Sequence, residues 1–415
     1  MVFTKQLFSK TMDIIRKSTI IYNTPLEHSS RLSSKYNANI FLKREDLQSV
    51  RSFKIRGAYN KIYSAYLDNI SNISITTCSA GNHAQGVAKT CNHLKIENDI
   101  FVPVSTPKQK IGRIKHFGGD YLTLHIAGNT LKESLELSTT HSKTNRSIFV
   151  HPYNDMDVIL GQSTIAQEIY ENIQPEYIIV PIGGGGLISG VGSYSKMCNP
   201  NGTLIGVEPE NANSMQLSLH NSLATKVRNL DTFVDGASVE IVGDKCFSIS
   251  EKLIDKMVTI NNGHLCTDII ELYQNEGIIS EPAGALGISA LEHIKDDIAN
   301  KTVVCILTGG NNDLSRYPNM VERATQYKGV KHYFLIDFNQ ISGQLVHFAQ
   351  SVLISGVDIT RFEYLKKDNI DTGTVLVGIE LDSPEQLSTI MENMKKFNYT
   401  YTIIQPGDLL HSYLI

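Results

Sequence analysis

The sequence predicts an α/β protein with a large part built on parallel sheet and a smaller α+β part at the C-terminus. Two observations lead to this fold class. Through residues 1–327, short β-branched runs alternate with amphipathic stretches, an order typical of crossover units in a buried parallel sheet. From residue 328 the order becomes strand, helix, strand, strand, helix, strand, which is ferredoxin-like in outline.

In the first part each strand-like run is short and apolar, and helix-like stretches such as Asn82–Leu94 and Gly161–Ile173 lie between the runs. Ligands of such sheets bind beside the carboxyl ends of the strands, so we expect functional residues in the segments that follow them. The strand-like runs are Asn39–Leu42, Ile73–Thr77, Asp99–Val102, Ser147–Val150, Tyr177–Pro181, Thr203–Val207 and Thr302–Leu307.

The character of the sequence changes near residue 327, where we place a domain boundary. Two helices on one face of an antiparallel sheet would make residues 328–415 a self-contained unit. Its expected elements are a strand at His332–Phe338, a helix at Gly343–Ser355, a strand at Ile359–Tyr364, a turn at Asp368–Gly373, a strand at Thr374–Leu381, a helix at Pro384–Phe397 and a strand at Thr400–Ile404.

The composition, with 41% hydrophobic and 19% charged residues, is ordinary for a globular protein. The formal net charge of -4 gives no basic excess, which argues against nucleic acid or an anionic membrane as a partner. We find no signal-peptide pattern and no apolar run long enough to span a bilayer, so we expect a cytoplasmic location. The six cysteines are scattered without a C-x-x-C pair, which predicts reduced thiols rather than disulfides or a zinc site.

Four consecutive glycines, Gly183–Gly186, follow the strand-like run Tyr177–Pro181 and precede a helix-like stretch that begins at Leu187. Glycines let backbone N–H groups approach an anion, and a helix N-terminus adds a favourable dipole, so the pattern predicts a phosphate-binding loop. The alternative is a plain tight turn, which needs fewer glycines. A dinucleotide fingerprint fits less well because Ile188 and Ser189 stand where its last glycine would be, and no Walker-type lysine follows.

Lys54 lies between Phe53 and Ile55, which places its amine in partly apolar surroundings. Desolvation would lower the pKa of this lysine and favour the neutral amine that a Schiff base requires. On its own the pattern is weak, because a lone lysine is usually exposed to solvent.

Three further segments combine small and polar residues at expected junctions between strands and helices. Thr77–Gly86 follows a strand and enters a helix, so its amides either bind a carboxylate or form a capped helix start. Thr308–Asp313 follows the run Thr302–Leu307 and is either a turn or a second ligand loop. Glu281–Ala285 leads into a helix, and we interpret it as close packing near the site.

Taken in order, the segments Ser52–Ala58, Ser79–Gly86, Gly183–Leu187, Glu281–Ala285 and Thr308–Asn311 make the chain resemble the tryptophan-synthase-β-like (fold type II) pyridoxal-phosphate enzymes. Within that class it closely resembles the threonine dehydratases over about residues 5–325, and the remainder resembles their single ACT-like domain. The resemblance implies a two-subdomain catalytic domain in residues 1–327, with the smaller subdomain inserted at about residues 50–150, and pyridoxal 5'-phosphate as the cofactor.

By the matching motifs, Lys54 would hold the cofactor covalently and then act as the base that takes the substrate's Cα proton. Phe53 would pack beside the cofactor, and Asn82 would hydrogen-bond to its ring hydroxyl. Thr308 would meet the pyridine nitrogen, and a neutral hydroxyl there would favour prompt loss of the β-hydroxyl. The cofactor phosphate would be held by the amides of Gly183, Gly184, Gly185, Gly186 and Leu187.

The loop that binds the substrate carboxylate in the family matches Ser79, Ala80, Gly81 and His83. Related serine racemases carry a serine at the position of Ala80, and because alanine cannot transfer a proton, we expect slow racemisation. Related β-replacement synthases usually carry threonine at the position of His83, which favours a dehydratase. The implied substrates are L-threonine and L-serine.

We expect no metal ion, although a monovalent cation near the cofactor phosphate stays open. Glu208 stands where some relatives bind a divalent cation, but the position six residues on is Ser214 rather than aspartate. His83 and His151 are interpreted as buried hydrogen-bonding groups because no third ligand has suitable spacing. The charged run Lys43–Asp46 is interpreted as structural.

The resemblance implies deamination of L-threonine to 2-oxobutanoate and ammonia, the first step of isoleucine biosynthesis. It also implies a homo-oligomer, a dimer or tetramer, regulated through the ACT-like domain by L-isoleucine or L-valine. The alternatives are a serine-preferring deaminase, a β-replacement synthase of the same class, and a non-catalytic amino-acid sensor. The intact Lys54 argues against the sensor.

Overall fold

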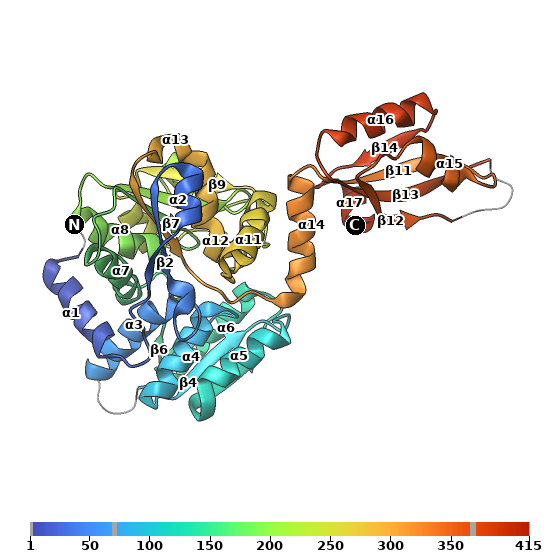
Figure 1. The fold of residues 1–415 in the computed structure, drawn as a ribbon. Helices are drawn as coiled ribbons and strands as arrows, with labels where there is room; N and C mark the ends of the chain where they lie inside the picture. The colour runs from blue at the N-terminus through green and yellow to red at the C-terminus, as the bar shows by residue number, and fades with distance from the viewer. Residues whose placement is uncertain (1–2, 69–72, 366–370, 415) are drawn as a thin grey trace. The chain divides into compact units, whose positions relative to one another are not determined.

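The computed structural model describes residues 3–68, 73–365 and 371–414. Contacts divide the chain into two units, Met1–Asp313 and Leu314–Ile415, whose elements Figure 1 labels. The first unit is built on parallel-rich sheets and the second on an antiparallel sheet, so the predicted fold class is confirmed. The helix before the expected boundary, α14 (Tyr317–Tyr327), is grouped with the second unit, and the boundary near residue 327 stays a prediction.

The larger sheet of the first unit is six-stranded and parallel apart from its first edge strand, β1, which pairs antiparallel to β2. Strand β10 lies between β2 and β7 in the sheet, although it is more than a hundred residues from either of them in sequence. Such distant pairs are possible because parallel strands are joined by long crossover connections that usually contain a helix. In spatial order the strands are β1 (Leu26–His28), β2 (Asn39–Arg44), β10 (Thr302–Leu307), β7 (Tyr177–Pro181), β8 (Thr203–Pro209) and β9 (Lys256–Ile260).

The smaller sheet of the first unit is four-stranded and wholly parallel. All its strands come from the continuous stretch between residues 75 and 149, and a hydrophobic cluster that also includes Ala58, Ile62 and Val158 packs with this sheet. The smaller subdomain expected at about residues 50–150 stays a prediction. In spatial order the strands are β5 (Leu122–Ile126), β4 (Asn98–Val102), β3 (Ile75–Cys78) and β6 (Ile148–Phe149).

Helices flank both sheets of the first unit, as Figure 1 shows. None of the described helices combines the length and the apolarity needed to cross a bilayer. The helices are α1 (Lys5–Lys17), α2 (Ser30–Tyr36), α3 (Lys54–Asp68), α4 (Asn82–Leu94), α5 (Lys108–Gly118), α6 (Leu131–Asn145), α7 (Met156–Tyr170), α8 (Gly186–Cys198), α9 (Ser214–Asn221), α10 (Asp244–Ser250), α11 (Asn262–Glu276), α12 (Pro282–Ser289) and α13 (Lys295–Ile298), with short 3-10 turns η1 (Glu45–Leu47), η2 (Gly119–Tyr121) and η3 (Ala290–Ile294).

The expected helix Gly161–Ile173 begins earlier, at Met156, because Asp155 caps it. The Asp155 carboxylate accepts hydrogen bonds from the backbone N–H groups of Asp157 at 2.9 Å and Val158 at 3.2 Å. Such a cap satisfies donors that the first helical turn leaves unpaired. The sequence interpretation did not include this cap.

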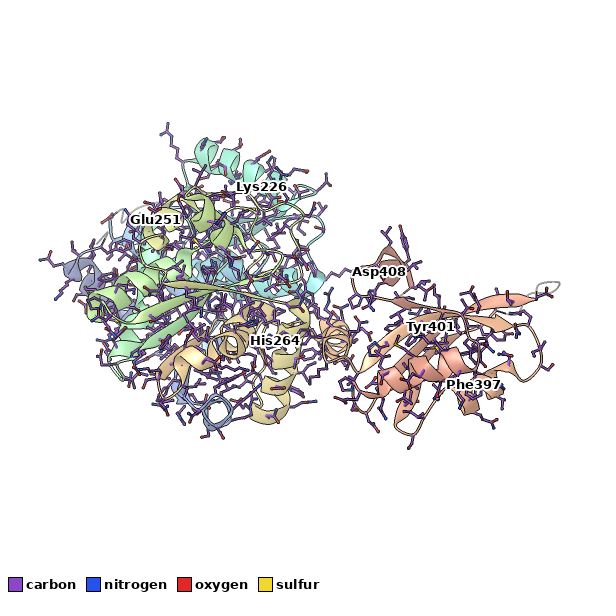
Figure 2. All side chains as sticks on the ribbon, turned by 90° about the horizontal axis from the view of Figure 1, so that it is seen from above. Lys226, Glu251, His264, Phe397, Tyr401 and Asp408 are labelled. Atoms are coloured by element: carbon purple, nitrogen blue, oxygen red, sulfur yellow. The ribbon has the colours of Figure 1, made fainter. Side chains whose placement is uncertain are left out.

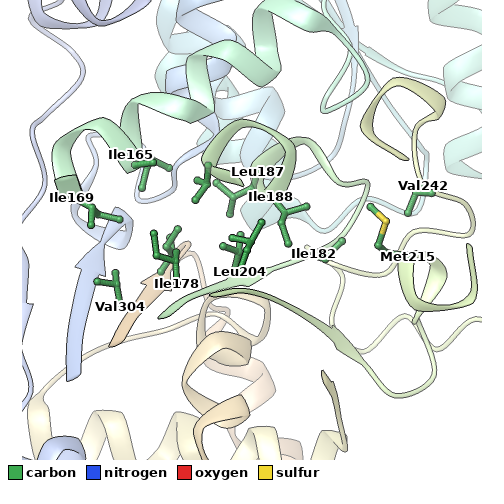
Figure 3. Packing of buried hydrophobic residues seen from close by; sticks show 14 of the residues in the cluster. Ile165, Ile169, Ile178, Ile182, Leu187, Ile188, Leu204, Met215, Val242 and Val304 are labelled. Carbon is green, nitrogen blue, oxygen red and sulfur yellow. The ribbon is translucent and has the colours of Figure 1, made fainter. Parts of the chain in front are cut away.

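The glycine run is held on both sides by core residues. Ile182 and Leu187 flank Gly183–Gly186 and belong to one buried cluster with Ile178 of β7 and Ile188 of α8 (Figure 3). Burying an aliphatic side chain of this size is worth about 1.5–3 kcal/mol. Burial of Ile182 and Leu187 therefore fixes the position of the glycine backbone relative to the sheet.

The second unit has the strand order β12-β13-β11-β14 with antiparallel pairs throughout, which is the βαββαβ arrangement expected. Figure 2 labels two residues of this unit, Phe397, which directly follows the helix Gln386–Lys396, and Tyr401, which begins the strand Tyr401–Ile404. Residues 368–370 of the expected turn Asp368–Gly373 lie outside the described residues. The elements of the second unit are η4 (Leu314–Arg316), α14, β11 (Lys331–Asn339), α15 (Gln344–Ser351), β12 (Val357–Glu363), β13 (Thr372–Leu381), α16 (Gln386–Lys396), β14 (Tyr401–Ile404) and α17 (Leu409–Leu414).

Candidate active site

Lys54 is the first residue of α3, and its ammonium is buried although the residue as a whole is partly exposed. Its ammonium donates a hydrogen bond to the Pro152 carbonyl at 2.9 Å and lies 5.2 Å from the centroid of the Phe53 ring. Burial lowers the pKa of Lys54 to about 8, against smaller opposite effects of Cys246 and Glu281. A neutral amine is therefore far more accessible here than on an ordinary lysine.

Backbone contacts tie the segment before Lys54 to the loop that follows β10. The N–H of Phe53 donates to the Thr308 carbonyl at 3.1 Å, and Ser52 forms an isolated β-bridge with Gly309. These contacts bring Lys54 and Thr308 to the carboxyl edge of the larger sheet, as expected for a ligand site of an α/β protein. The Thr308 hydroxyl is buried and donates to the Ala283 carbonyl at 3.2 Å.

The glycine run forms the opposite wall of the same cavity. Gly185 has a φ of 93°, and a Cβ on Gly184 would overlap the ring of Tyr153. Gly186 starts α8, so free N–H groups of the first helical turn stand beside the loop. The cavity is lined by Phe53, Lys54, Tyr153, Gly183, Gly184, Gly185, Gly186, Leu187, Thr308 and their neighbours Pro181, Ile182, Gly236, Ala237 and Ala283.

This cavity fits pyridoxal phosphate on three structural grounds. A buried lysine with a lowered pKa can bind an aldehyde, and a glycine cradle at a helix N-terminus can bind a phosphate. The Thr308 hydroxyl can meet a ring nitrogen. The structure thus brings Lys54, Phe53, Thr308 and the glycine run together, while their individual roles stay predictions.

Asn82 hydrogen-bonds to Glu281 and to the amide of Asn311, and both amides are partly buried. Its Nδ2 donates to Glu281 Oε1 at 2.6 Å, and its Oδ1 accepts from Asn311 Nδ2 at 2.7 Å. Asn311 Nδ2 also donates to the Val50 carbonyl at 2.9 Å. These contacts fix the orientation of the Asn82 amide and leave its second N–H for another acceptor.

Glu281 is a polar component that the sequence interpretation had taken for close packing alone. Burial raises the pKa of its carboxyl to about 7, Asp235 raises it further, and the hydrogen bond from Asn82 opposes the shift. A Cβ at position 309 would overlap Glu281 Oε1, so any residue larger than glycine there would displace this carboxyl group. The sequence signal was a carboxylate directly before a proline that begins a helix, which by itself identifies no partner.

The loop from Ser79 to His83 follows β3, but the cavity lining described above does not include it. Gly81 N–H donates to Ser79 Oγ at 3.3 Å, which closes the turn before α4. His83 Nε2 pairs with the Val150 carbonyl at 3.0 Å, and burial, then Lys54, lowers the His83 pKa to about 3. His83 is therefore neutral at physiological pH, and substrate binding by Ser79, Ala80, Gly81 and His83 stays a prediction.

The side chains of His151 and Glu208 both accept hydrogen bonds from backbone N–H groups. His151 Nδ1 accepts from the N–H groups of Tyr153 and Asn154 at 3.2 and 2.9 Å, and burial lowers the His151 pKa to about 4. The Glu208 carboxylate accepts from the N–H groups of Met215 at 2.7 Å and Gln216 at 2.9 Å, at the start of α9. Both oxygens of Glu208 thus bind a helix N-terminus.

The charged run Lys43–Asp46 is part of a buried ion network that sequence reasoning did not assemble. Arg56, fully buried in α3, bonds to Glu45 at 2.8 Å and to Glu168 of α7 at 2.6 Å. Lys43 bonds to Glu168 at 2.6 Å. Two cations thus balance two anions, and the network ties the start of α3 to the sheet and to α7.

Comparison with known proteins agrees with this geometry. Residues 17–309 match the family of pyridoxal-phosphate-dependent enzymes, and residues 322–414 match the C-terminal regulatory domain of threonine dehydratase. The biosynthetic L-threonine dehydratase of Halalkalibacterium halodurans is 42% identical over 398 residues, which cover 95% of this chain and 96% of that protein. The enzyme of the same name from Staphylococcus saprophyticus is 44% identical over 417 residues, covering 98% of each.

Solved structures show the same relationship. The processed form of threonine deaminase isoform 2 from Solanum lycopersicum superposes with a TM-score of 0.71 at 36% identity, covering 78% of this chain and 94% of that one. Maize serine racemase gives a TM-score of 0.70 at 26% identity, covering 78% and 98%. The resemblance drawn from the sequence motifs is confirmed. The chain belongs to the pyridoxal-phosphate-dependent enzymes, and among them to the threonine dehydratases with a C-terminal regulatory domain.

Proposed function

We propose that the chain deaminates L-threonine by β-elimination of its hydroxyl, giving 2-oxobutanoate and ammonia, as the first step of isoleucine biosynthesis. The observation that carries the proposal is the meeting of Lys54 and the glycine run at one cavity. Similarity to threonine dehydratases over nearly the whole chain supports the choice of substrate.

Bound in this cavity, pyridoxal phosphate supplies an electron sink for the pair left at the substrate Cα. Lys54 is the residue we assign to proton removal, because its lowered pKa leaves a usable fraction of neutral amine near neutral pH. The amides of Gly183–Gly186 and Leu187 would hold the phosphate and Thr308 the ring nitrogen. Asn82, oriented by Glu281 and Asn311, would donate its second N–H to the ring hydroxyl.

The substrate carboxylate would lie against Ser79–His83, where Ala80 offers no group that could return a proton to the opposite face. We therefore expect elimination to be faster than racemisation. A methyl group on the substrate β-carbon is worth only about 1–3 kcal/mol in pocket discrimination, so L-serine should also react, though more slowly.

The test is production of 2-oxo acid from L-threonine and from L-serine by purified protein with added cofactor. Faster 2-oxobutanoate formation from threonine, abolished in Lys54→Ala, supports the proposal. The exposed Lys115→Ala, on α5, is the matched control and should retain full activity. Cofactor binding without 2-oxo acid from either substrate contradicts the proposal and favours a β-replacement synthase.

We further propose that L-isoleucine or L-valine inhibits the enzyme through the C-terminal unit, since that unit matches the threonine dehydratase regulatory domain. An effector must bind two states of the enzyme with different affinity. Threonine saturation curves and melting temperatures measured with each amino acid test this. If neither measurement changes, the effector proposal is wrong while the catalytic proposal stands.

We also propose a cytoplasmic homo-oligomer, either a dimer or a tetramer. Ile341, Leu345 and Val346, which are close together in the second unit's sequence, have exposed apolar side chains that assembly would cover. The six cysteines are free thiols, which suits a reducing compartment. Light scattering after size exclusion will give the number of chains, and a monomer at micromolar concentration would contradict the oligomer.

A further inference from the structure

Two histidines and an aspartate, side chains that commonly bind metal ions, lie close together at the smaller sheet and have no role in the proposed reaction. Asp99 is on β4, His125 on the edge strand β5, and His141 on α6. His125 Nε2 lies 2.6 Å from Asp99 Oδ1, and His141 Nε2 lies 3.2 Å from Asp99 Oδ2. One ligand atom from each residue lies within 4.8 Å of the other two. Three elements of the subdomain thus converge on one point.

We propose that Asp99, His125 and His141 form a binding site for a transition-metal ion of the zinc type. Two imidazoles and one carboxylate are a ligand set that suits such ions. Ligands at about 2.0–2.1 Å from a tetrahedral zinc ion lie roughly 3.3 Å apart. His141 Nε2 lies at about this distance from Asp99 Oδ2, whereas His125 Nε2 lies 2.6 Å from the other oxygen, Oδ1. If one oxygen serves as the ligand, the Asp99 carboxylate has to shift as the ion binds. Water would be the fourth ligand.

Neighbouring side chains hold the two rings in place. The His125 ring stacks on Phe101, with centroids 4.3 Å apart and planes 11° from parallel. Asn145 Nδ2 lies 3.1 Å from His141 Nε2 and also donates to the His141 carbonyl. The amide would have to give up its contact with Nε2 when a metal binds. The His141 ring also contacts Phe101, with centroids 5.2 Å apart, and this contact does not involve the ligand nitrogen. Because Phe101 packs against both rings, metal binding costs less side-chain ordering.

The cluster is also accessible from solvent. The side chains of His125, Asp99 and His141 are 31%, 24% and 27% exposed. His125 and His141 line an open cavity of about 640 Å³, whose wall includes Glu133 and Glu136. Carboxylates in the wall of a cavity attract cations. The site therefore has an entry path, which a metal site requires.

A bound ion would link the edge strand β5 and helix α6 to β4. None of its three ligands lines the cavity that contains Lys54 and the glycine run. We therefore assign the site a stabilising role in the smaller subdomain, separate from the proposed deamination. The competing explanation is a set of two surface His–Asp pairs without an ion, and the two explanations predict different responses to metal.

The experiment is a calorimetric titration of the chelator-treated holoenzyme with Zn²⁺ alone, followed by thermal melting with and without Zn²⁺. We expect one Zn²⁺ per chain and a rise in melting temperature. His125→Phe retains an aromatic ring against Phe101 but removes the nitrogen ligand, and His141→Ala removes the other imidazole. Each should weaken Zn²⁺ binding roughly tenfold or more and abolish the thermal shift.

His116→Ala, an exposed histidine on α5, is the matched control and should bind Zn²⁺ as the unaltered protein does. Because the thiol of Cys198 is exposed and can also bind Zn²⁺, every titration is repeated in a Cys198→Ser background. Absence of Zn²⁺ binding in that background, or equal binding by the His125→Phe and His141→Ala variants, overturns the proposal. Cobalt absorption that is lost in both variants supports direct nitrogen coordination.

Discussion

Lys54 carries a positive charge less readily than an ordinary lysine because its ammonium is buried. Only the neutral amine attacks an aldehyde, so the rate of cofactor uptake by apoenzyme should rise with pH through about 8. Glu281 raises the Lys54 pKa, so Glu281→Gln should move the midpoint to lower pH. The measurement is the initial rate at which bound-cofactor absorbance appears. A midpoint near the ordinary lysine value of about 10.4 would contradict this assignment.

Glu208 should make the protein less stable as pH rises. Burial raises its pKa to about 8 in the folded chain, from 4.5, against the opposing effect of the Met215 and Gln216 N–H groups. Between these values the folded state holds a proton that the unfolded state has lost, so the free energy of unfolding falls as pH increases. Each pKa unit is worth about 1.4 kcal/mol.

Glu208→Gln should therefore flatten the dependence of unfolding free energy on pH between about 4.5 and about 8, as measured by urea denaturation at several pH values. Glu210→Gln, two residues further on and exposed, should leave the dependence as it is. If both variants retain the full slope, the Glu208 carboxyl does not cause it.

Helix α3 depends on the ion network around Arg56 for its position, and with it the place of Lys54. Glu168→Ala would leave Arg56 and Lys43 buried with one anion fewer, and breaking a buried pair costs about 3–5 kcal/mol. We expect a large loss of unfolding free energy in urea, together with weaker cofactor binding.

The matched control for this network is Glu171→Ala, three residues after Glu168 at the C-terminal end of α7. Glu171 bonds to Arg16 at 2.5 Å, but both side chains are about half exposed. Exposed pairs contribute only about 0.2–1 kcal/mol. Equal losses in the two variants would show that burial does not determine the strength of these pairs.

Sequence patterns predicted the elements whose signal is local, and missed the contacts that depend on distant residues. The strand Tyr177–Pro181 and the start of α4 at Asn82 were predicted to the residue, because apolar runs and glycines mark them. The Arg56–Glu168 pair joins residues 112 apart, and the Glu281–Asn82 bond joins residues 199 apart. No periodicity encodes such pairs, since the crossover topology creates them.

The molecule as a whole combines two units, each with its own buried cluster. Phe338 lies at the centre of the second unit, fully buried and in ring contact with Phe348, Phe362, Tyr364 and Tyr399. Removing a buried aromatic ring costs about 3–5 kcal/mol, a large fraction of what holds a unit of this size together. Phe338→Ala should therefore unfold the second unit and leave the first folded.

If effector binding occurs in the second unit, Phe338→Ala should abolish inhibition by L-isoleucine while threonine deamination continues. The reason is that coupling between two sites requires both to be folded. Limited proteolysis will show whether only the second unit is cut, and inhibition curves will show whether the response is lost. Tyr413→Ala, where the side chain is 82% exposed, should retain both the fold and the response. Unchanged inhibition in a Phe338→Ala chain whose second unit is unfolded would place the effector site in the first unit instead.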